Sequence, residues 1–405
     1  MPVFSSEFIR AIPKTDLHVH LDGSLRLTTL IELAKEQNVS LPAYTPEGLM
    51  ETVFKKAYKD LPEYLQGFAY TCAVMQDPDS LERIAYEFAL DNAAEGVFYV
   101  EVRFAPQLHV NDHMDMETVI SSVNRGLERA KKDINKAKAD PDMPDFEYGI
   151  IVCNLRMFMG ESSPYYKKIM DALSWSPRKE IFAQASLQLA RAAIDIRDRK
   201  GYPVVGFDLA GAEHGYPAID HMEAFHYAHR NFMKKTVHAG EAYGAESIFQ
   251  AITALHADRI GHGYLLFSKE ALTNPEITDK EAYLKKLSEY IADRRITIEV
   301  CLTSNRQTNP GLVDISKHSL RDMLKHNLSV TLCTDNRLVS QTTVSDEIEL
   351  AIKNFDIAPG TLRNIIVYGF KRSFFPGSYV QKRNYVRGVI DYYEKICKKH
   401  GVASK

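Results

Sequence analysis

Eight short stretches of β-forming residues alternate with helical segments along this chain, and this alternation constrains its fold more than any other feature. Most of these stretches are apolar on both faces, as in parallel strands that are buried between two layers. Eight alternations favour a closed (β/α)8 TIM barrel over an open sheet, so we predict an α/β protein with this fold. The predicted strands cover residues 14–20, 97–104, 148–155, 203–209, 235–239, 258–262, 296–302 and 329–334.

Two connections between the predicted strands are much longer than the usual loops of a barrel. Residues 22–95 follow the first strand and have a helical pattern, and residues 155–202 separate the third and fourth strands. Neither connection is rich in Gly or Ser, and no Pro/Gly-rich boundary divides the chain. We therefore predict a single domain over residues 1–405, with a helical insertion after strand 1 and a further insertion between strands 3 and 4.

Charge and cysteine content exclude several classes of protein. The 405 residues carry a formal net charge of −3, so we expect no nucleic-acid partner. Five scattered cysteines without CxxC spacing are typical of reduced thiols in a reducing compartment. The N-terminus has no secretory pattern, and no stretch approaches the ~18 apolar residues of a membrane span. We therefore expect a cytoplasmic protein that does not bind membranes, and the oligomeric state is not predicted.

Polar residues with metal-binding chemistry end several predicted strands. His18 and His20 point to one face of the first strand, because side chains at i and i+2 share a face. His238 lies at the end of the fifth strand, and Asp335 follows the eighth. All strands of a TIM barrel end on one rim, where functional residues collect. Three imidazoles and one carboxylate suit Zn²⁺ or a similar divalent ion, so these four residues are the predicted metal ligands.

Two further residues at this rim are candidates for catalysis. Glu241 follows Gly240 beside a predicted ligand, where we favour proton transfer over a simple ion pair with a neighbouring cation. His262 lies between two glycines and is either a core residue or a group that a ligand approaches closely. A metal-bound water has a pKa near ~7, so the predicted site can supply a nucleophile at neutral pH.

The remaining histidines and the fourth strand limit this prediction. The fourth strand contains no lysine, whereas barrels that hold two metal ions commonly use a carboxylated lysine there, so we predict one ion. Surface or loop positions without a functional role are expected for His109, His113, His214, His221, His226, His229, His256, His318, His326 and His400.

The order and spacing of these motifs resemble the adenosine deaminase family of metal-dependent barrels, over nearly the whole chain. The matching motifs are His18-Val19-His20-Leu21-Asp22-Gly23, Ile84-Ala85-Tyr86-Glu87-Phe88, Glu101-Val102-Arg103, Asp208-Leu209-Ala210-Gly211, His238-Ala239-Gly240-Glu241, Arg259-Ile260-Gly261-His262-Gly263 and Thr334-Asp335. The resemblance implies a hydrolase of purine salvage that converts adenosine and 2′-deoxyadenosine to inosine or deoxyinosine and ammonia.

The resemblance also implies a role for each candidate residue. One zinc ion and the attacking water are held by His18, His20, His238 and Asp335. Glu241 protonates N1 of the purine, which makes C6 electrophilic. His262 orients the attacking water, takes its proton or stabilises the developing oxyanion.

Four residues resemble the substrate-binding positions of the family: His20, Asp22, Gly211 and Asn336. Gly211 resembles the backbone donor to purine N3, and Asp22 resembles the acceptor of ribose hydroxyls. Many members carry a second Asp that contacts N7 where this chain has Asn336. Because N7 is an acceptor, the amide of Asn336 can donate to it without a protonated carboxyl.

A stripe of apolar residues in the first insertion has two compatible interpretations. Leu61, Tyr64, Leu65 and Phe68 fall on one face of a predicted helix. Such a stripe is commonly core packing. The resemblance adds a lid over the purine that excludes water.

Other substrates and a non-catalytic role remain as alternatives. AMP is disfavoured, because Asp22 would repel a phosphate that Arg or Lys should bind. Adenine and a modified adenine nucleoside are the alternative substrates. A protein that only binds zinc for stability would need four closed ligands, and Glu241 and His262 would then have no role.

Overall fold

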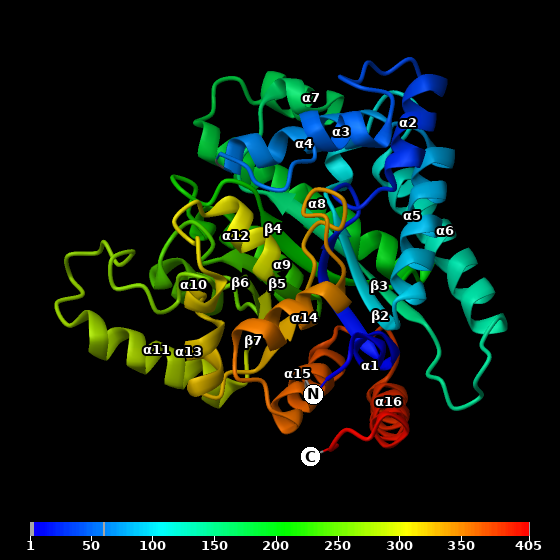
Figure 1. Cartoon of the computed structure of the whole chain (residues 1–405). Helices are drawn as coiled ribbons and strands as arrows, with labels where there is room; N and C mark the ends of the chain where they lie inside the picture. Colours follow the sequence, from blue (N-terminus) through cyan, green and yellow to red (C-terminus); the bar gives the residue numbers. More distant parts are fainter. Residues whose placement is uncertain (1–3, 60, 405) are drawn as a thin grey trace.

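The computed structural model describes residues 4–59 and 61–404, and Figure 1 shows helices arranged around a central sheet. Eight parallel strands pair in the order β1-β2-β3-β4-β5-β6-β7-β8. They are β1 Lys14–His20, β2 Val97–Phe104, β3 Glu147–Leu155, β4 Val204–Ala210, β5 Lys234–Ala239, β6 Arg259–His262, β7 Thr297–Val300 and β8 Val330–Leu332.

The first and last strands meet through the residues that carry the predicted metal ligands. Val19 and Asp335 form a parallel bridge. The backbone N–H of His20 donates to the carbonyl of Asp335 across 2.7 Å, and the N–H of Asp335 donates to the carbonyl of His18 across 2.8 Å. The predicted (β/α)8 barrel is therefore confirmed, and its closure brings the ligands at both ends of the chain together.

Helices follow the strands and cover the outside of the sheet. Among them, α5 packs on α6 and β2, and α15 packs against β1 and β8. The helices are α1 Ser6–Ala11, α2 Leu27–Glu36, α3 Pro46–Thr52, α4 Leu61–Ala73, α5 Pro78–Ala94, α6 Met116–Lys136, α7 Pro164–Ala172, α8 Arg178–Lys200, α9 Met222–Arg230, α10 Ala245–Thr253, α11 Lys280–Arg294, α12 Leu302–Thr308, α13 Leu320–Lys325, α14 Val344–Asn354, α15 Pro359–Arg372 and α16 Tyr379–His400. No helix in the described part of the chain is long and apolar enough to cross a membrane.

The two long connections are helical. α2, α3 and α4 precede α5 between β1 and β2, and α7 and α8 lie between β3 and β4. In Figure 1, α3, α4 and α7 lie together at the top of the view, away from both termini. Residues of α4 and of the segment before α7 line the same cavity as the ends of the strands. The insertions therefore cover the rim of the barrel that carries the predicted site.

The seventh strand ends earlier than the sequence pattern predicted. β7 stops at Val300, and Leu302 begins α12. The buried carboxylate of Glu347 accepts hydrogen bonds from the backbone N–H groups of Leu302, at 2.8 Å, and Thr303, at 3.3 Å. These are N–H groups that the first turn of a helix leaves without partners, so a distant side chain determines where the strand gives way to the helix.

Candidate active site

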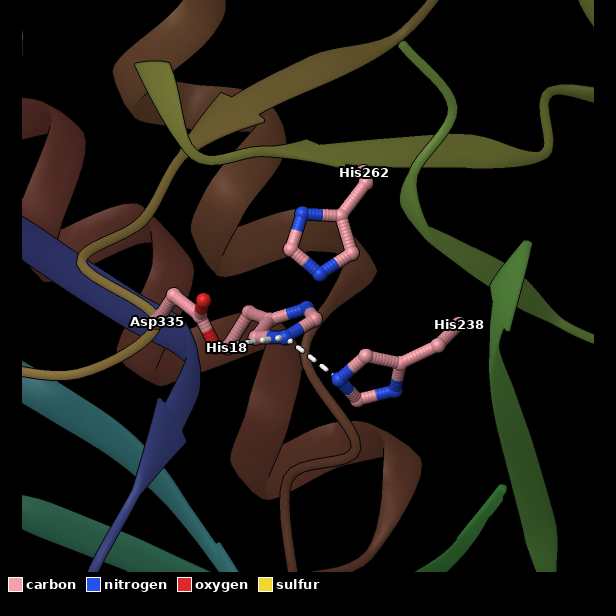
Figure 2. A group of neighbouring side chains, drawn as sticks. All are labelled: His18, His238, His262 and Asp335. Carbon is pink, nitrogen blue, oxygen red and sulfur yellow. Dashed lines mark hydrogen bonds and ion pairs between the residues drawn. The ribbon is translucent and has the colours of Figure 1, made fainter. Parts of the chain in front are cut away.

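The four predicted metal ligands converge on one point at the rim of the barrel. Nε2 of His238 lies 3.0 Å from Nε2 of His18 and 3.1 Å from Nε2 of His20. Oδ1 of Asp335 lies 3.4 Å from Nε2 of His18 and 3.5 Å from Nε2 of His20. Figure 2 shows His18, His238 and Asp335 pointing toward one another, with His262 beside them. Ligands about 2.0–2.2 Å from a tetrahedral Zn²⁺ are separated by similar distances.

The protonation of the histidines supports a cation at this point. Nδ1 of His18 lies 2.8 Å from the carboxylate of Glu299, and Nδ1 of His238 lies 3.1 Å from that of Asp208. Each Nδ1 therefore carries the ring proton. The two Nε2 atoms lie 3.0 Å apart, and their lone pairs face each other. Facing lone pairs repel unless a proton or a metal ion lies between them. The donor set and its orientation therefore fit a divalent metal ion.

The pKa values of these groups are set by burial, by the neighbouring carboxylates and by the other imidazoles. Burial and the Arg103 charge lower the pKa of His18, but the carboxylates of Asp335 and Glu299 outweigh them and leave it raised. Burial lowers the pKa of His238, and lowers that of His20 well below its usual value. The pKa of Asp335 is held well below its usual range despite burial, because of its contact with His18 and the other neighbouring imidazoles. Three imidazoles and an ionised carboxylate therefore surround the candidate metal position.

A buried arginine holds the carboxylates that orient the histidines. Nη1 of Arg103 donates to Asp208 and Nη2 donates to Glu299, both across 2.9 Å, and all three side chains are fully buried. The pKa values of both carboxyls are well below their usual range because nearby cations outweigh the cost of burial. Arg103 and Asp208 stand in the recognised motifs, but their function as a support for His18 and His238 was not predicted. The presence of a charged residue inside a predicted apolar strand was the sequence feature that could have indicated this function.

Backbone strain and close packing mark the rim at these strand ends. His262 and Asp335 have positive φ angles of 62° and 61°, a conformation that side chains other than glycine rarely adopt. A Cβ atom at Gly261 would lie 2.8 Å from Cε1 of His18. Glycine is therefore required where β6 passes the imidazole.

Hydrogen bonds on the Nδ1 side of His262 determine which ring nitrogen carries its proton. The backbone N–H of Leu320 donates to Nδ1 of His318 across 3.0 Å, so the proton of this neutral ring is on Nε2. That Nε2 lies 3.1 Å from Oδ1 of Asn305, and Nδ2 of Asn305 lies 3.0 Å from Nδ1 of His262. The Asn305 amide therefore donates to His262, whose own proton is placed on Nε2. Burial lowers the pKa of His262 well below its usual value, so the ring is neutral.

Glu241 lies in the same cavity, and its own carboxyl is a protonated acid at neutral pH. Burial raises the pKa of its carboxyl to about 8, and the charges of Asp335 and Glu213 add to the effect. Its Oε1 accepts from Thr308 across 3.5 Å, and its Oε2 lies 3.7 Å from Nε2 of His262. A carboxyl with such a pKa can donate a proton at neutral pH.

The loop that carries Glu241 is held by a second carboxylate, which the sequence did not reveal. Glu213 is 6% exposed and accepts four backbone hydrogen bonds, from Gly240 at 2.8 Å, Glu241 at 3.1 Å, Ala242 at 2.8 Å and Tyr243 at 2.9 Å. The hydroxyl of Ser247 also donates to it, across 2.5 Å. One side chain thus fixes the backbone of the predicted acid.

The predicted substrate-binding residues line the cavity, which has a volume of about 360 Å³. Asp22, Gly211 and Asn336 are all in its wall, together with His20. The amide nitrogen of Asn336 donates to the hydroxyl of Tyr64 across 2.7 Å, and its Oδ1 is buried without a hydrogen-bond partner. Among the described residues of this wall there is no Lys or Arg.

Helix α4 contributes the predicted apolar stripe to the cavity. Tyr64, Leu65 and Phe68 all line it, and Tyr64 is buried whereas Leu65 is 40% exposed. The side chain of Leu61 lies outside those that the structure describes. The stripe therefore packs over the site, as expected for either a core contact or a lid.

Three of the histidines expected at surface or loop positions are buried, so a surface position is excluded for them. His109, His221 and His318 are 0–1% exposed. His221 accepts or donates a hydrogen bond at Nδ1, 2.6 Å from Ser186, and His318 is linked to His262 through Asn305. Their burial depends on distant segments packing over them, so no local pattern in the sequence could indicate it.

Comparison with known proteins decides the family. The sequence model of the family described as adenosine deaminase matches residues 13–392. The chain belongs to the adenosine deaminase family. An adenosine deaminase of Mycolicibacterium vanbaalenii is 36% identical over 369 residues, which cover 90% of this chain and 91% of the relative.

Solved structures of similar proteins support the same architecture. An amidohydrolase from Burkholderia ambifaria with bound Zn has a TM-score of 0.74 at 19% identity, covering 98% of this chain and 95% of the other. An Arabidopsis N6-mAMP deaminase has a TM-score of 0.70 at 25% identity, covering 95% and 99%. Both proteins thus share this barrel fold with the chain over nearly their entire length.

Proposed function

We propose that this protein hydrolyses adenosine and 2′-deoxyadenosine to inosine or deoxyinosine and ammonia, with one Zn²⁺ per chain. The observation that carries the proposal is the convergence of four donors, three of which line one cavity, beside a carboxyl in that cavity whose pKa is raised to about 8. A strictly structural metal site would not need that acid. The membership of the adenosine deaminase family supports the substrate class.

His18, His20, His238 and Asp335 would hold the zinc ion. When bound, zinc lowers the pKa of a water toward ~7 and so supplies a nucleophile at neutral pH. Asp208 and Glu299 keep the Nδ1 protons in place, so the Nε2 lone pairs of His238 and His18 stay available to a metal.

Glu241 and His262 perform the proton chemistry in this proposal. Glu241 donates its proton to N1 of the purine, which reduces the aromatic character of the ring and makes C6 electrophilic. The Nε2–H of His262 donates a hydrogen bond to the oxygen that adds to C6 and stabilises its charge. The attacking water gives up two protons: one goes to the 6-amino group, which leaves as ammonia, and the other restores the proton of Glu241. The water oxygen remains at C6, and N1 keeps the proton it received from Glu241.

The wall of the cavity orients the nucleoside. The backbone N–H of Gly211 donates to N3, and the Asn336 amide donates to N7 with the hydrogen that Tyr64 does not accept. Asp22 accepts hydrogen bonds from ribose hydroxyls. Tyr64, Leu65 and Phe68 cover the purine and exclude water from the reacting atoms.

The charge of the cavity favours a nucleoside over a nucleotide. A 5′-phosphate needs Arg or Lys, and the described wall contains neither but does contain Asp22. Free adenine and N6-modified adenine nucleosides remain the alternative substrates, because they share the purine contacts and carry no phosphate.

A spectrophotometric assay of the metal-analysed protein with adenosine, 2′-deoxyadenosine, adenine, N6-methyladenosine and AMP tests the proposal. We expect kcat/KM to be highest for adenosine and 2′-deoxyadenosine and lowest for AMP. A preference for adenine would remove the role of Asp22 in ribose recognition. A preference for AMP would contradict the assignment of a nucleoside substrate.

A further inference from the structure

A second group of metal-binding side chains lies behind the wall of the cavity. Asp22 follows β1, Cys72 lies near the end of α4, and His109 follows β2 after a short turn. One carboxylate oxygen, the sulfur and one ring nitrogen of these residues all lie within 4.8 Å of one another. The group shares no residue with the four ligands of the first site.

Polar atoms of this group are buried without partners. His109 is 0% exposed, and neither ring nitrogen has a partner in full hydrogen-bond geometry among the described residues; the Met75 backbone lies close enough to raise the pKa of the ring against the effect of burial. Asp22 is 4% exposed, and its Oδ1 also has no hydrogen-bond partner; Nδ1 of His20 is 4.0 Å away. A buried polar group without a partner costs about 1–3 kcal/mol, so such atoms commonly mark a ligand position.

The chemistry of the three donors is that of a transition-metal site. Burial keeps His109 neutral, because its pKa falls to about 4, and a neutral ring has a free lone pair. Imidazole, thiolate and carboxylate together suit Zn²⁺ and related ions, whereas Mg²⁺ and Ca²⁺ prefer oxygen ligands alone. Side-chain rotations bring donors within 4.8 Å to the distances of about 2.0–2.3 Å that zinc requires.

We propose that Asp22, Cys72 and His109 bind a second divalent transition-metal ion. The ion binds the sulfur of Cys72 as it displaces the thiol proton, which leaves to solvent. Because Asp22 also lines the cavity, the ion reaches this position from the substrate side.

The second ion acts as an inhibitor, and this consequence rests on the proposed function. Asp22 cannot hold a metal ion and accept ribose hydroxyls at the same time. Zn²⁺ in excess of one equivalent therefore raises KM for adenosine and leaves kcat unchanged.

Titration of the metal-free protein with Co²⁺ tests the site without any substrate. A cobalt–thiolate bond absorbs in the near ultraviolet, and the first site has no sulfur donor. We expect binding of two ions per chain, with near-ultraviolet absorption that develops with the second. Cys72→Ser should bind one ion and lose this absorption, and His109→Gln should weaken binding of the second ion alone.

A matched substitution distinguishes Cys72 from the other cysteine of the cavity. Cys153→Ser should keep the near-ultraviolet absorption, because Cys153 lies outside the group of three donors. The visible bands of the first cobalt ion and the far-ultraviolet circular dichroism confirm that each variant is folded. Saturation of the wild-type protein at one ion per chain, or a near-ultraviolet band that survives Cys72→Ser, would overturn the proposal. Neither result depends on which substrate is turned over.

Discussion

The amide of Asn305 donates a hydrogen bond to Nδ1 of His262 across 3.0 Å, and this contact places the ring proton on the nitrogen that faces the cavity. His318 fixes the orientation of the amide, because its Nε2–H donates to Oδ1 of Asn305. His262 therefore acts as a hydrogen-bond donor in this account, and the chain from Leu320 through His318 and Asn305 is what orients that donor.

Replacement of Asn305 by Asp should reverse the position of this proton. A carboxylate at this place accepts from Nδ1, so Nε2 loses its hydrogen and can no longer donate to the oxygen at C6. We expect kcat to fall on the order of 10²-fold, with KM and metal content nearly unchanged. Steady-state kinetics and metal analysis provide the measurement. Asn309→Asp, a similar change one turn further along, is the control, and equal losses in both variants would argue against the donor role of His262.

The pH dependence of turnover should report the acid in the cavity. Glu241 is active in its protonated form, and burial raises the pKa of its carboxyl to about 8. Below that pH the proton is available, and above it kcat/KM, which reports ionisation of the free enzyme, should fall about tenfold for each pH unit. Glu241→Gln should keep its fold and zinc but lose activity on the order of 10²- to 10⁴-fold. Turnover that persists in this variant would exclude Glu241 as the acid.

Glu213 should affect both the rate and the position of this pH limb. Glu213→Gln removes a charge that helps raise the pKa of Glu241, and it presents amide hydrogens to four backbone donors. We expect kcat to drop on the order of 10²-fold through misplacement of the acid, and the alkaline limb to move to lower pH. Glu246→Gln, which alters a carboxylate that accepts from the N–H of Asn274 across 2.7 Å, should leave both unchanged. An alkaline limb at the same pH in Glu213→Gln would contradict this electrostatic role.

Arg103 should be essential for stability. Arg103→Met leaves the buried carboxylates of Asp208 and Glu299 without their shared partner, and loss of one side of a buried ion pair costs about 3–5 kcal/mol. The free energy of unfolding, from denaturant titrations at pH 7 with saturating zinc, should fall by about this amount. Arg387→Met removes an exposed ion pair with Asp391 on α16 and should change stability little. Similar losses of unfolding free energy in the two variants would show that the buried ion pairs stabilise the fold no more than an exposed ion pair does.

The barrel could be predicted from sequence because its strands are apolar and their lengths are close to those of the apolar runs in the sequence. β1 and β2 begin and end at the predicted residues, and the ligands His18 and His20 follow from the alternation of side chains in a strand. The convergence of His238 and Asp335 followed from the common rim of parallel strands.

The supporting residues could not be predicted, because their roles depend on contacts between distant segments. Glu213 is 27 residues from Gly240, and nothing near Glu213 in sequence indicates that its carboxylate binds the backbone of the loop after β5. The same holds for Asn305 and His318, whose effect on His262 arises only when α12 and the segment before α13 pack behind β6. The early end of β7 similarly depends on Glu347, 45 residues from Leu302.

Diffraction at the zinc absorption edge, from crystals of protein loaded with one equivalent of zinc, tests the central claim most directly. The account predicts one anomalous peak about 2.0–2.2 Å from Nε2 of His18, His20 and His238 and from an oxygen of Asp335. A peak outside this group, or protein that turns over adenosine with no metal between these four side chains, would contradict it.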